Sequence, residues 1–341
     1  AEAQHERTHI TPAGEWLLDN QHLIETQVEV ARRHLPVGYS RVLPHLVDGP
    51  FAGYPRVYHL ALEVIAHVDG RVDAESLTRF VAAWQETATL TLGELWAIPI
   101  MLRLALIENL RRVATRVEIA MLHRDLARDW SAQILRAAEQ DPRRLLLAVS
   151  DMARADPPFS SAFVAELVKR LQEKGGLVDI PLNWIDHQLA MLGTSLQSRV
   201  QAEASDQAAN QVSVSSSIGS LRFLDTMVWR DFVESSSLVE SVLRQDPSRS
   251  YALMDFASRD RYRHVVEDLA RLARIDEVEV ARAAIELARG SLSAADGDTR
   301  GTHVGTYLVD EGRRSLVERL PTLPALARAR LALRLLALPH E

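Results

Sequence analysis

The sequence predicts an all-α protein, built as a packed antiparallel bundle or array of helices. Apolar residues recur at the spacing of one helix face along nearly the whole chain, whereas the alternating pattern of strands is almost missing. Gly and Pro gather in a few stretches that separate these periodic segments. Hydrophobic residues make up 47% of the 341 residues and charged residues 25%, which is enough apolar material for a large core.

The first predicted helix begins at Thr11-Pro12, because a Pro in the first turn lacks only an N–H that has no partner within the helix. Its apolar face continues to Leu35. The Pro/Gly-rich loop 36–55 follows, and its length and aromatic content predict that it packs back onto the helices. A second helix is expected over about 56–67.

Two capping patterns predict the next helices. Asp73 precedes an amphipathic stretch and is expected to cap it. Thr91 and Glu94 have the spacing of a capping box, which predicts the start of a very long helix over about 92–140. Pro99 lies inside that stretch, so it is expected either to kink the helix near Leu95 or to mark its true start.

Similar signals divide the rest of the chain. Helix starts are predicted at Asp141-Pro142, Ser160 and 276–279, and helix ends at Gly175-Gly176 and Gly290. The serine-rich stretch 210–220 is compatible with a helix or a loop. The Asp-Pro stretches at 140–143 and 245–249 precede similar apolar segments, which indicates two related helical halves. The predicted division is the following: an N-terminal half 1–140, a second half 141–290, a linker 291–302 and a tail 303–341.

Composition excludes several classes of protein. The absence of Cys removes disulfides, Cys-ligated zinc and cysteine nucleophiles from consideration. A net charge of −7 argues against a nucleic-acid partner. The first ten residues are charged and polar, unlike a signal peptide, and no apolar run approaches the roughly 18 residues of a membrane span. We therefore expect this sequence to be soluble.

No known catalytic motif stands out in the sequence. It contains no P-loop, no dinucleotide-binding glycine motif, no nucleophile elbow and no zinc-protease motif. The histidines are scattered without metal-ligand spacing, so neither a metal nor another cofactor is expected. Glu63, Glu94, Asp255 and Asp310 lie near aromatic residues and could serve as an acid and a base in sugar chemistry. A structural role is favoured for Glu94 as a capping-box partner and for Asp255 as a helix cap.

The densest groups of polar and aromatic residues form the candidate site. They suit a sugar site or a domain interface, and equally a buried loop whose polar groups bind one another. The residues are Arg56, Tyr58, Glu63, His67, Glu94, Trp96 and Arg103. The charged stretch 259–264 is expected to be a solvated, salt-bridged helix face.

The end of the chain is basic and rich in leucine. From Gly312 onward there are two acidic residues and six arginines, with five leucines crowded between Leu331 and Leu338. Such a segment is typical of an amphipathic closing helix, and also of a chain about to enter a membrane from the cytoplasmic side.

Five stretches together resemble one family of enzymes. They are 10–24, 49–58, 90–97, 254–263 and 303–308, and they are similar to the N-terminal, pre-membrane region of bacterial cyclic β-1,2-glucan synthases. The resemblance implies a helical region that precedes membrane spans and a family 84 glycosyltransferase domain using UDP-glucose, in a large inner-membrane protein of periplasmic glucan biosynthesis. The sequence has none of that transferase's motifs, so no catalytic residue is carried over.

The resemblance favours the interpretation of the tail as a juxtamembrane segment. We expect a non-catalytic scaffold or regulatory region at the cytoplasmic face of the inner membrane. Its expected partners are other domains of the same polypeptide, the β-glucan, and an anionic membrane surface through the tail. The alternatives are an α-helical carbohydrate-active or glucan-binding domain, and an interaction module for an export partner.

Overall fold

The computed structural model describes residues 10–35, 38–172, 179–293 and 299–320. Within these ranges the regular elements are α-helices, with one 3-10 turn and an isolated β-bridge between His45 and Pro55, so the all-α prediction is confirmed. In the same ranges, no helix combines the length and the apolar character that crossing a membrane requires.

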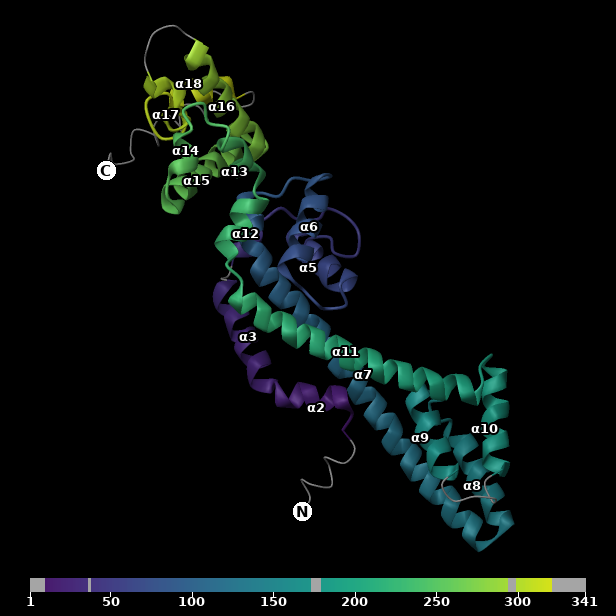
Figure 1. The fold of residues 1–341 in the computed structure, drawn as a ribbon. Coiled ribbons are helices and arrows are strands. Elements are labelled where there is room, and N and C mark those ends of the chain that lie inside the picture. The colour runs from purple at the N-terminus through teal and green to yellow at the C-terminus, as the bar shows by residue number, and fades with distance from the viewer. Residues whose placement is uncertain (1–9, 36–37, 173–178, 294–298, 321–341) are drawn as a thin grey trace. The chain divides into compact units, whose positions relative to one another are not determined.

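The chain forms two compact units, each assembled from separate segments (Figure 1). Unit 1 contains 1–36, 62–72 and 102–225, and unit 2 contains 37–61, 73–101 and 226–341. Each unit therefore combines segments from both predicted halves, and the relation between those halves remains a prediction. The division between the units falls inside α5 (Arg56–His67) and α7 (Leu92–Gln140), and just before the last residue of the helix 196–226.

Most of the other helices of unit 1 are long. They are α2 (Pro12–Asp19), α3 (Gln21–His34), α8 (Pro142–Ala155), α9 (Ser161–Gln172), α10 (Asp179–Met191) and α11 (Leu196–Thr226). The expected cap at Thr11 is present, but the predicted first helix is broken at Asn20, whose backbone leaves the helical region. One core of this unit includes Phe163 and Ile185, both fully buried, and joins α8, α9 and α10 to the second half of α7.

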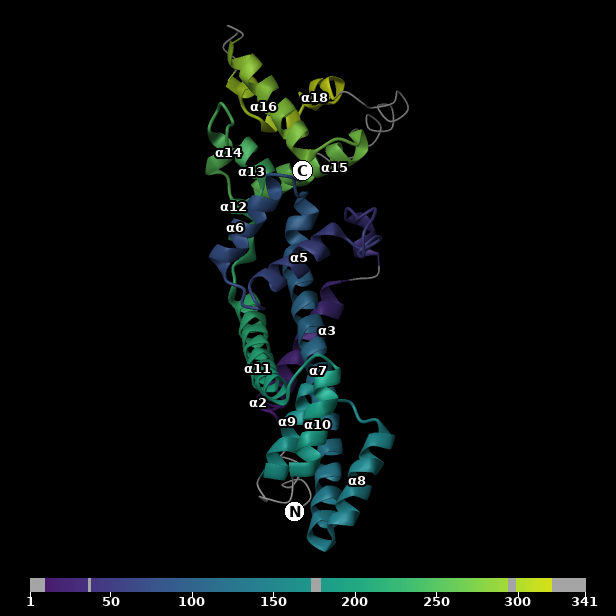
Figure 2. The same ribbon diagram turned by 90° about the vertical axis from the view of Figure 1, so that its right-hand side faces the viewer.

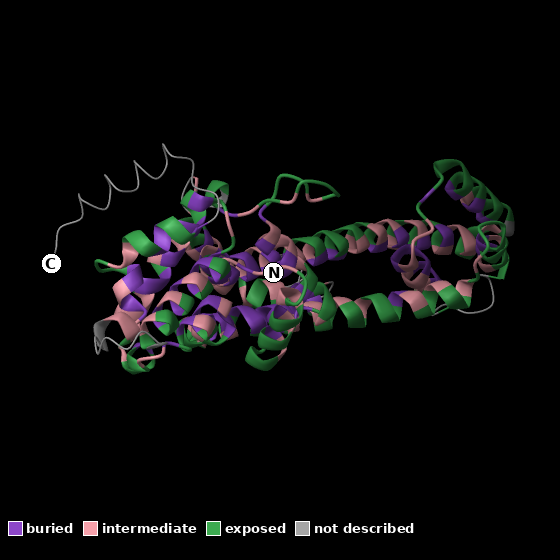
Figure 3. Ribbon diagram, turned by 90° about the horizontal axis from the view of Figure 1, so that it is seen from above, coloured by how far each residue is buried: buried purple, intermediate pink, exposed green. Residues whose placement is uncertain are grey.

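The long helix α7 has the predicted start and end. It begins at Leu92 rather than at Pro99, which lies inside it. Its first half is buried on almost every side, whereas Ala127 and Ile134 belong to a single buried stripe in the second half. Figure 3 shows buried, intermediate and exposed residues alternating along the helices, as expected where one face packs on a neighbour.

The serine-rich stretch 210–220 is helical and belongs to α11. Ser220 Oγ accepts the Val72 N–H and donates to the Gly70 carbonyl, both at 2.7 Å. Asn109 donates to Ser217 Oγ at 3.0 Å. A Cβ on Gly70, whose φ is +77°, would lie 2.9 Å from that same hydroxyl. The serines are therefore the small polar face that lets the turn at Gly70 approach the helix closely.

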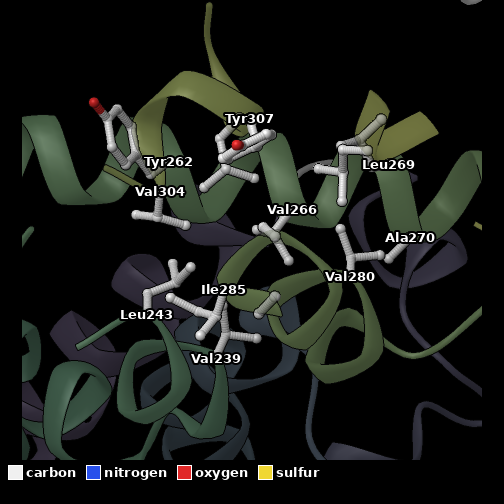
Figure 4. Close-up of a cluster of buried hydrophobic side chains, with 14 of the residues drawn as sticks. Val239, Leu243, Tyr262, Val266, Leu269, Ala270, Val280, Ile285, Val304 and Tyr307 are labelled. Carbon is white, nitrogen blue, oxygen red and sulfur yellow. The ribbon is translucent and has the colours of Figure 1, made fainter. Parts of the chain in front are cut away.

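The shorter helices belong mainly to unit 2. They are α4 (Tyr39–Val42), α6 (Ala74–Gln85), α12 (Trp229–Ser236), α13 (Leu238–Leu243), α14 (Ser250–Leu253), α15 (Phe256–Ala273), α16 (Glu277–Ser293), η1 (Thr299–Thr302), α17 (Gly305–Leu308) and α18 (Arg313–Arg319). Figure 2 shows α13 to α18 gathered together, and Figure 4 shows apolar side chains of α13, α15, α16 and α17 meeting in one core.

The loop 36–55 packs back as predicted. Phe51 stacks near His59, and Tyr54 near Tyr58, with ring centroids 5.2 and 6.0 Å apart. Leu46 exchanges backbone hydrogen bonds with the segment at 53–54, which closes the loop into a short hairpin. The loop therefore places its aromatic side chains against α5.

Two features at the end of the chain differ from expectation. The predicted helix end at Gly290 is wrong, because α16 continues to Ser293 and the space around Gly290 is open. The first part of the predicted tail is a core element: Leu316, Val317 and Leu320 are buried in the core of unit 2. The leucine-rich stretch 321–341 and Gly175-Gly176 lie outside the described residues.

Candidate functional site

Arg56 and Glu94 form a buried ion pair in unit 2. Arg56 Nε and Nη2 lie 2.6 and 2.7 Å from the two oxygens of Glu94, which is the parallel fork geometry of a strong pair. The Glu94 side chain is fully buried and that of Arg56 is 23% exposed. Arg56 also donates to the Thr89 carbonyl. The pair joins the first residue of α5 to the first turn of α7.

Thr91 and Glu94 form the predicted capping box. Thr91 Oγ1 accepts the Glu94 N–H at 3.2 Å, and Glu94 Oε2 accepts the Thr91 N–H at 2.9 Å. The hydroxyl of Thr91 contacts Oε2 as well, at 3.1 Å. Oε1 of Glu94 thus receives one donor, from Arg56, and Oε2 receives three, from Arg56 and Thr91. Together they use about all the acceptor capacity of the carboxylate. This side chain is held in place by the fold.

Glu277 lies beside this pair and caps the same helix from another element. It is the first residue of α16, it is 6% exposed, and its Oε2 accepts the Leu92 N–H at 2.9 Å. Burial raises the pKa of Glu277 to about 7; the hydrogen bond from Leu92 opposes this rise, and the nearby acidic side chains Glu267, Asp276 and Glu94 add to it. We call Arg56, Thr91, Glu94 and Glu277 the helix-start cluster.

The remaining residues of the predicted site belong partly to unit 1 and partly to unit 2. Tyr58 packs against Tyr54, and Trp96 makes an edge-to-face contact with Phe256, both in unit 2. Glu63 and His67 are exposed on the part of α5 that belongs to unit 1. The predicted set therefore does not form one site within either unit.

Arg103 also belongs to unit 1, where it joins three elements. It donates to Gln27 at 3.0 Å and to Asp225 at 2.8 Å, and Gln27 in turn donates to Asp225 at 2.7 Å. These bonds link α3, α7 and α11. Arg103 is thus a structural tie between helices.

The other candidate acids have local roles. Asp255 accepts the Ser258 N–H at 2.8 Å and caps α15, as predicted. Asp310 is exposed and accepts the neighbouring Glu311 N–H. In the described part of the chain, no three His, Asp or Glu side chains gather closely enough to hold a metal ion.

The stretch 259–264 is only partly a solvated helix face, contrary to expectation. Arg261 and His264 are exposed, but Arg263 is 1% exposed and lies among acidic side chains. Its Nη1 is 2.7 Å from Glu240, which is also 1% exposed. The helical period explains the difference, because one residue in three or four of any such run faces the core.

Glu240 is the centre of a buried charge network. Besides Arg263, it accepts from the Tyr251 hydroxyl at 2.7 Å and from Arg244 at 2.9 Å. Burial first and Glu240 second raise the pKa of Tyr251, so the hydroxyl remains a donor. Glu234 extends the network by binding Arg259 through both of its oxygens, at 2.8 and 2.9 Å. Sequence reasoning missed Glu240, since nothing in its neighbourhood distinguishes it from a surface glutamate.

Asp246 is a second buried acid that the sequence did not identify. It lies in the second Asp-Pro stretch, and it accepts hydrogen bonds from Ser248, from the Tyr251 and Val304 N–H groups, and from His303 at 3.0 Å. Burial opposes its ionisation, yet these bonds outweigh burial and lower the pKa of Asp246 to about 2. Asp141, its counterpart in the first Asp-Pro stretch, is an ordinary helix cap.

The residues around Asp246 do not have the arrangement of a catalytic triad. Ser248 Oγ and Asp246 both contact the same nitrogen of His303, Nδ1, at 3.3 and 3.0 Å. In a triad the imidazole would lie between the two, with one partner on each nitrogen. Nε2 instead faces the Tyr262 hydroxyl at 3.4 Å. The group therefore fixes the start of α17 against α15.

The chain was compared with family models and with known proteins. No protein-family model matches the chain. The chain is 36% identical over 320 residues to the cyclic beta-(1,2)-glucan synthase NdvB of Rhizobium meliloti (strain 1021). The resemblance predicted from the sequence is confirmed. The aligned region covers 93% of this chain and 11% of the synthase, so the chain corresponds to a small part of that protein.

The stretches that suggested the glucan synthase resemblance contain the buried polar groups described above. Stretch 49–58 provides Arg56, and 90–97 provides Thr91 and Glu94. Stretches 254–263 and 303–308 provide Arg263 and His303. These stretches of the chain thus contain residues that hold helices together.

The capping box gives a prediction of stability. In Thr91→Ala the Glu94 N–H loses its acceptor, so the free energy of unfolding should fall by about 1 kcal/mol. Urea denaturation followed by circular dichroism measures this change. Thr91→Ser keeps the hydroxyl and is the matched control. An unchanged stability in Thr91→Ala, or an equal loss in Thr91→Ser, would contradict a capping role.

The raised pKa of Glu277 gives a prediction of pH dependence. The unfolded chain ionises this group near 4.5 and the folded protein near 7, so wild-type stability falls between these values as the pH rises. Glu277→Gln keeps an acceptor for Leu92 and cannot ionise. The free energy of unfolding of this variant, relative to that of wild type, should therefore rise by about 3 kcal/mol between pH 4 and pH 8. Urea denaturation at each pH measures the difference.

The control for this experiment is Glu279→Gln, which removes one exposed acid from the same first turn of α16. A stability difference between Glu277→Gln and wild type that stays constant with pH would contradict the prediction. So would the same trend in the control.

Proposed function

We propose that this chain is a non-catalytic helical scaffold or regulatory region of a membrane-bound cyclic β-1,2-glucan synthase, an enzyme that makes cyclic glucan from UDP-glucose. The observation that carries the proposal is the 36% identity to such a synthase along 93% of the chain. The contacts of the buried acids support it, because these residues bind arginines and backbone N–H groups.

Glu94 is the clearest support among the candidate residues. A general acid or base needs a carboxyl group that can exchange a proton with a substrate within hydrogen-bond reach. Glu94 is fully buried, and its oxygens receive Arg56, the Thr91 N–H and the Thr91 hydroxyl. A group held in this way suits a structural role, in which it stabilises the start of α7.

A scaffold role also accords with the kinds of contact in both units. Ion pairs tie helices that are distant in sequence, such as Arg124 to Glu203 at 2.8 Å and Arg128 to Glu166 at 3.0 Å. Such fixed helices could present a constant surface to other domains of the same polypeptide. Contact with the growing glucan, or with an export partner, is the alternative role for the same surface.

The proposed location is the cytoplasmic face of the bacterial inner membrane. Support comes from the basic, leucine-rich stretch 321–341, which follows Leu320, the last core residue among those the structure describes. Arg328, Arg330 and Arg334 would contact anionic headgroups in this arrangement. Each arginine near an anionic surface contributes on the order of 1 kcal/mol.

The first test concerns catalysis. The purified chain should release no UDP when it is incubated with UDP-glucose, a divalent metal and acceptor glucan, because its buried acids are committed to the fold. Chromatography of the products measures turnover. Turnover that disappears in Glu63→Gln or Asp310→Asn, the two exposed candidate acids other than the helix cap Asp255, would overturn the non-catalytic proposal.

The second test concerns the membrane surface. The chain should sediment with anionic vesicles and not with neutral ones, and binding should weaken as salt shortens the Debye length below about 10 Å. Replacing Arg328, Arg330 and Arg334 together by Gln should weaken binding by roughly a hundredfold, which corresponds to about 1 kcal/mol for each charge.

A chain ending at Leu320 distinguishes an anchor from a core element. It retains the buried residues of α18, so it should fold like the whole chain while losing vesicle binding. Loss of the fold in this variant, or binding that does not depend on lipid charge, would contradict the membrane role.

A further inference from the structure

Unit 1 contains a cavity of about 390 Å³ that is lined by α7, α11 and the starts of α2 and α9. Figure 1 shows α9 in the angle between the two long helices. The volume lies within the range of roughly 300–1,000 Å³ that is usual for small-molecule sites. None of the seven residues of the predicted site lines this cavity.

Helical spacing directs polar side chains of both long helices into the cavity lining. On α7, Arg116 and Arg124 are eight residues apart, which places them on one face about two turns from each other. On α11, Arg199, Glu203 and Gln207 follow one another at four-residue spacing. The cavity thus has guanidinium groups on both of its long sides.

Two of these arginines carry N–H groups without an acceptor in the described part of the chain. Arg124 is 8% exposed; its Nη2 binds Glu203 at 2.8 Å, while its Nη1 is buried and has no protein acceptor there. The Nε of Arg199 is in the same situation. A buried donor without a partner costs about 1–3 kcal/mol, and more when it is charged. Both arginines line the cavity, and a ligand oxygen that reached these N–H groups would supply the missing acceptor.

The charges of the lining favour a negatively charged ligand. Arg116, Arg124 and Arg199 face two acids, Glu203 and Asp206. Glu203 is already bound by Arg124 and by Gln207, the latter at 2.6 Å, so its negative charge is satisfied within the protein. Asp206 and Arg116 are both exposed. Three guanidinium groups against two carboxylates leave the lining with one net positive charge.

A neutral sugar fits the lining less well than an anion does. No Phe, Tyr or Trp side chain is among the residues that line the cavity, so the large flat apolar surface on which a sugar ring could stack is missing from it. Its apolar contribution comes from small residues such as Ala120 and from Val117. Hydroxyl groups are supplied by Thr11 and Ser160, and His123 holds the latter at 2.8 Å.

We propose that this cavity binds a small oxyanion, namely phosphate or the phosphate group of a small phosphorylated molecule, through Arg124 and Arg199. Guanidinium groups and phosphate oxygens match in charge and in hydrogen-bond geometry. The hydroxyl and amide groups around the arginines would bind the rest of a phosphorylated polyol. The proposal rests on the cavity alone and does not depend on the proposed function.

Isothermal titration calorimetry of the whole chain tests this site. Inorganic phosphate, glucose 1-phosphate and glucose are titrated separately at low salt. One saturable site is expected for both phosphates and none for glucose. Tighter binding of glucose 1-phosphate would identify a phosphorylated sugar as the ligand class, and equal binding would identify the free ion. Saturable binding of glucose, or no binding of either phosphate, would overturn the proposal.

Three variants locate the binding. Arg199→Gln should weaken phosphate binding roughly tenfold or more, because one charge-assisted hydrogen bond is lost. Arg199→Lys keeps the charge but lacks Nε, so it should also bind more weakly than wild type. Arg154→Gln removes an arginine that is 74% exposed on α8, outside the cavity, and should bind as wild type does. Equal loss in Arg154→Gln and Arg199→Gln would show general charge attraction and would contradict the site.

Hydrogen exchange with and without phosphate gives a second measurement in the unmodified chain. Added protection should be confined to the cavity-lining parts of α7, α11 and the start of α9. Because this measurement uses the unmodified chain, it tests the site even if a variant loses stability. Protection spread over both units, or confined to unit 2, would contradict the proposal.

Discussion

The constraint on which unit 2 depends is the desolvation of Glu94. A fully buried carboxylate is stable only when its acceptor positions are filled, and here they are filled by Arg56 and Thr91. Because these donors belong to the first turns of α5 and α7, and Glu277 adds the start of α16, the helix-start cluster fixes where three helices begin. The positive ends of their dipoles also favour carboxylates at this place. The neighbouring apolar core, centred on residues such as Val266 and Ile285, then packs on helices whose ends are already defined.

Much of this fold could be read from local chemistry, because caps and turns are encoded within a few residues. The sequence predicts helix caps at Asp73 and Asp255 and helix starts at Thr11 and Asp141, and all four residues cap their helices. The reciprocal bonds of Thr91 and Glu94 were equally visible, since both partners lie within four residues. The partner of Glu94 lies 38 residues away, so no spacing rule could supply it.

The candidate site was harder to predict because burial depends on tertiary contacts. Arg263 looked solvated in a run of charged residues, yet its helix turns it into the core, where Glu240 lies 23 residues earlier in the chain. The same limit applies to Arg124 and Arg199, whose unpaired N–H groups come from different helices. The glucan synthase resemblance could be predicted from the sequence, because it depends on many short matches spread along the whole chain and not on tertiary contacts.

The buried pairing of Glu240 with Arg263 has a consequence for how this sequence can diverge. Replacing either partner alone leaves the other buried charge with weaker compensation, from Arg244 for Glu240 and from Asp260 for Arg263. The cost should therefore approach but not exceed about 3–5 kcal/mol, the cost of a broken buried pair. A domain of this kind has a total stability of only about 5–15 kcal/mol, so a single replacement here would remove a large fraction of it. Tyr251 donates to the same Glu240 carboxylate, so a replacement of Glu240 would also leave this hydroxyl without its acceptor. Descendants of this sequence should therefore exchange such residues together or keep them all, and drift freely on the exposed helix faces.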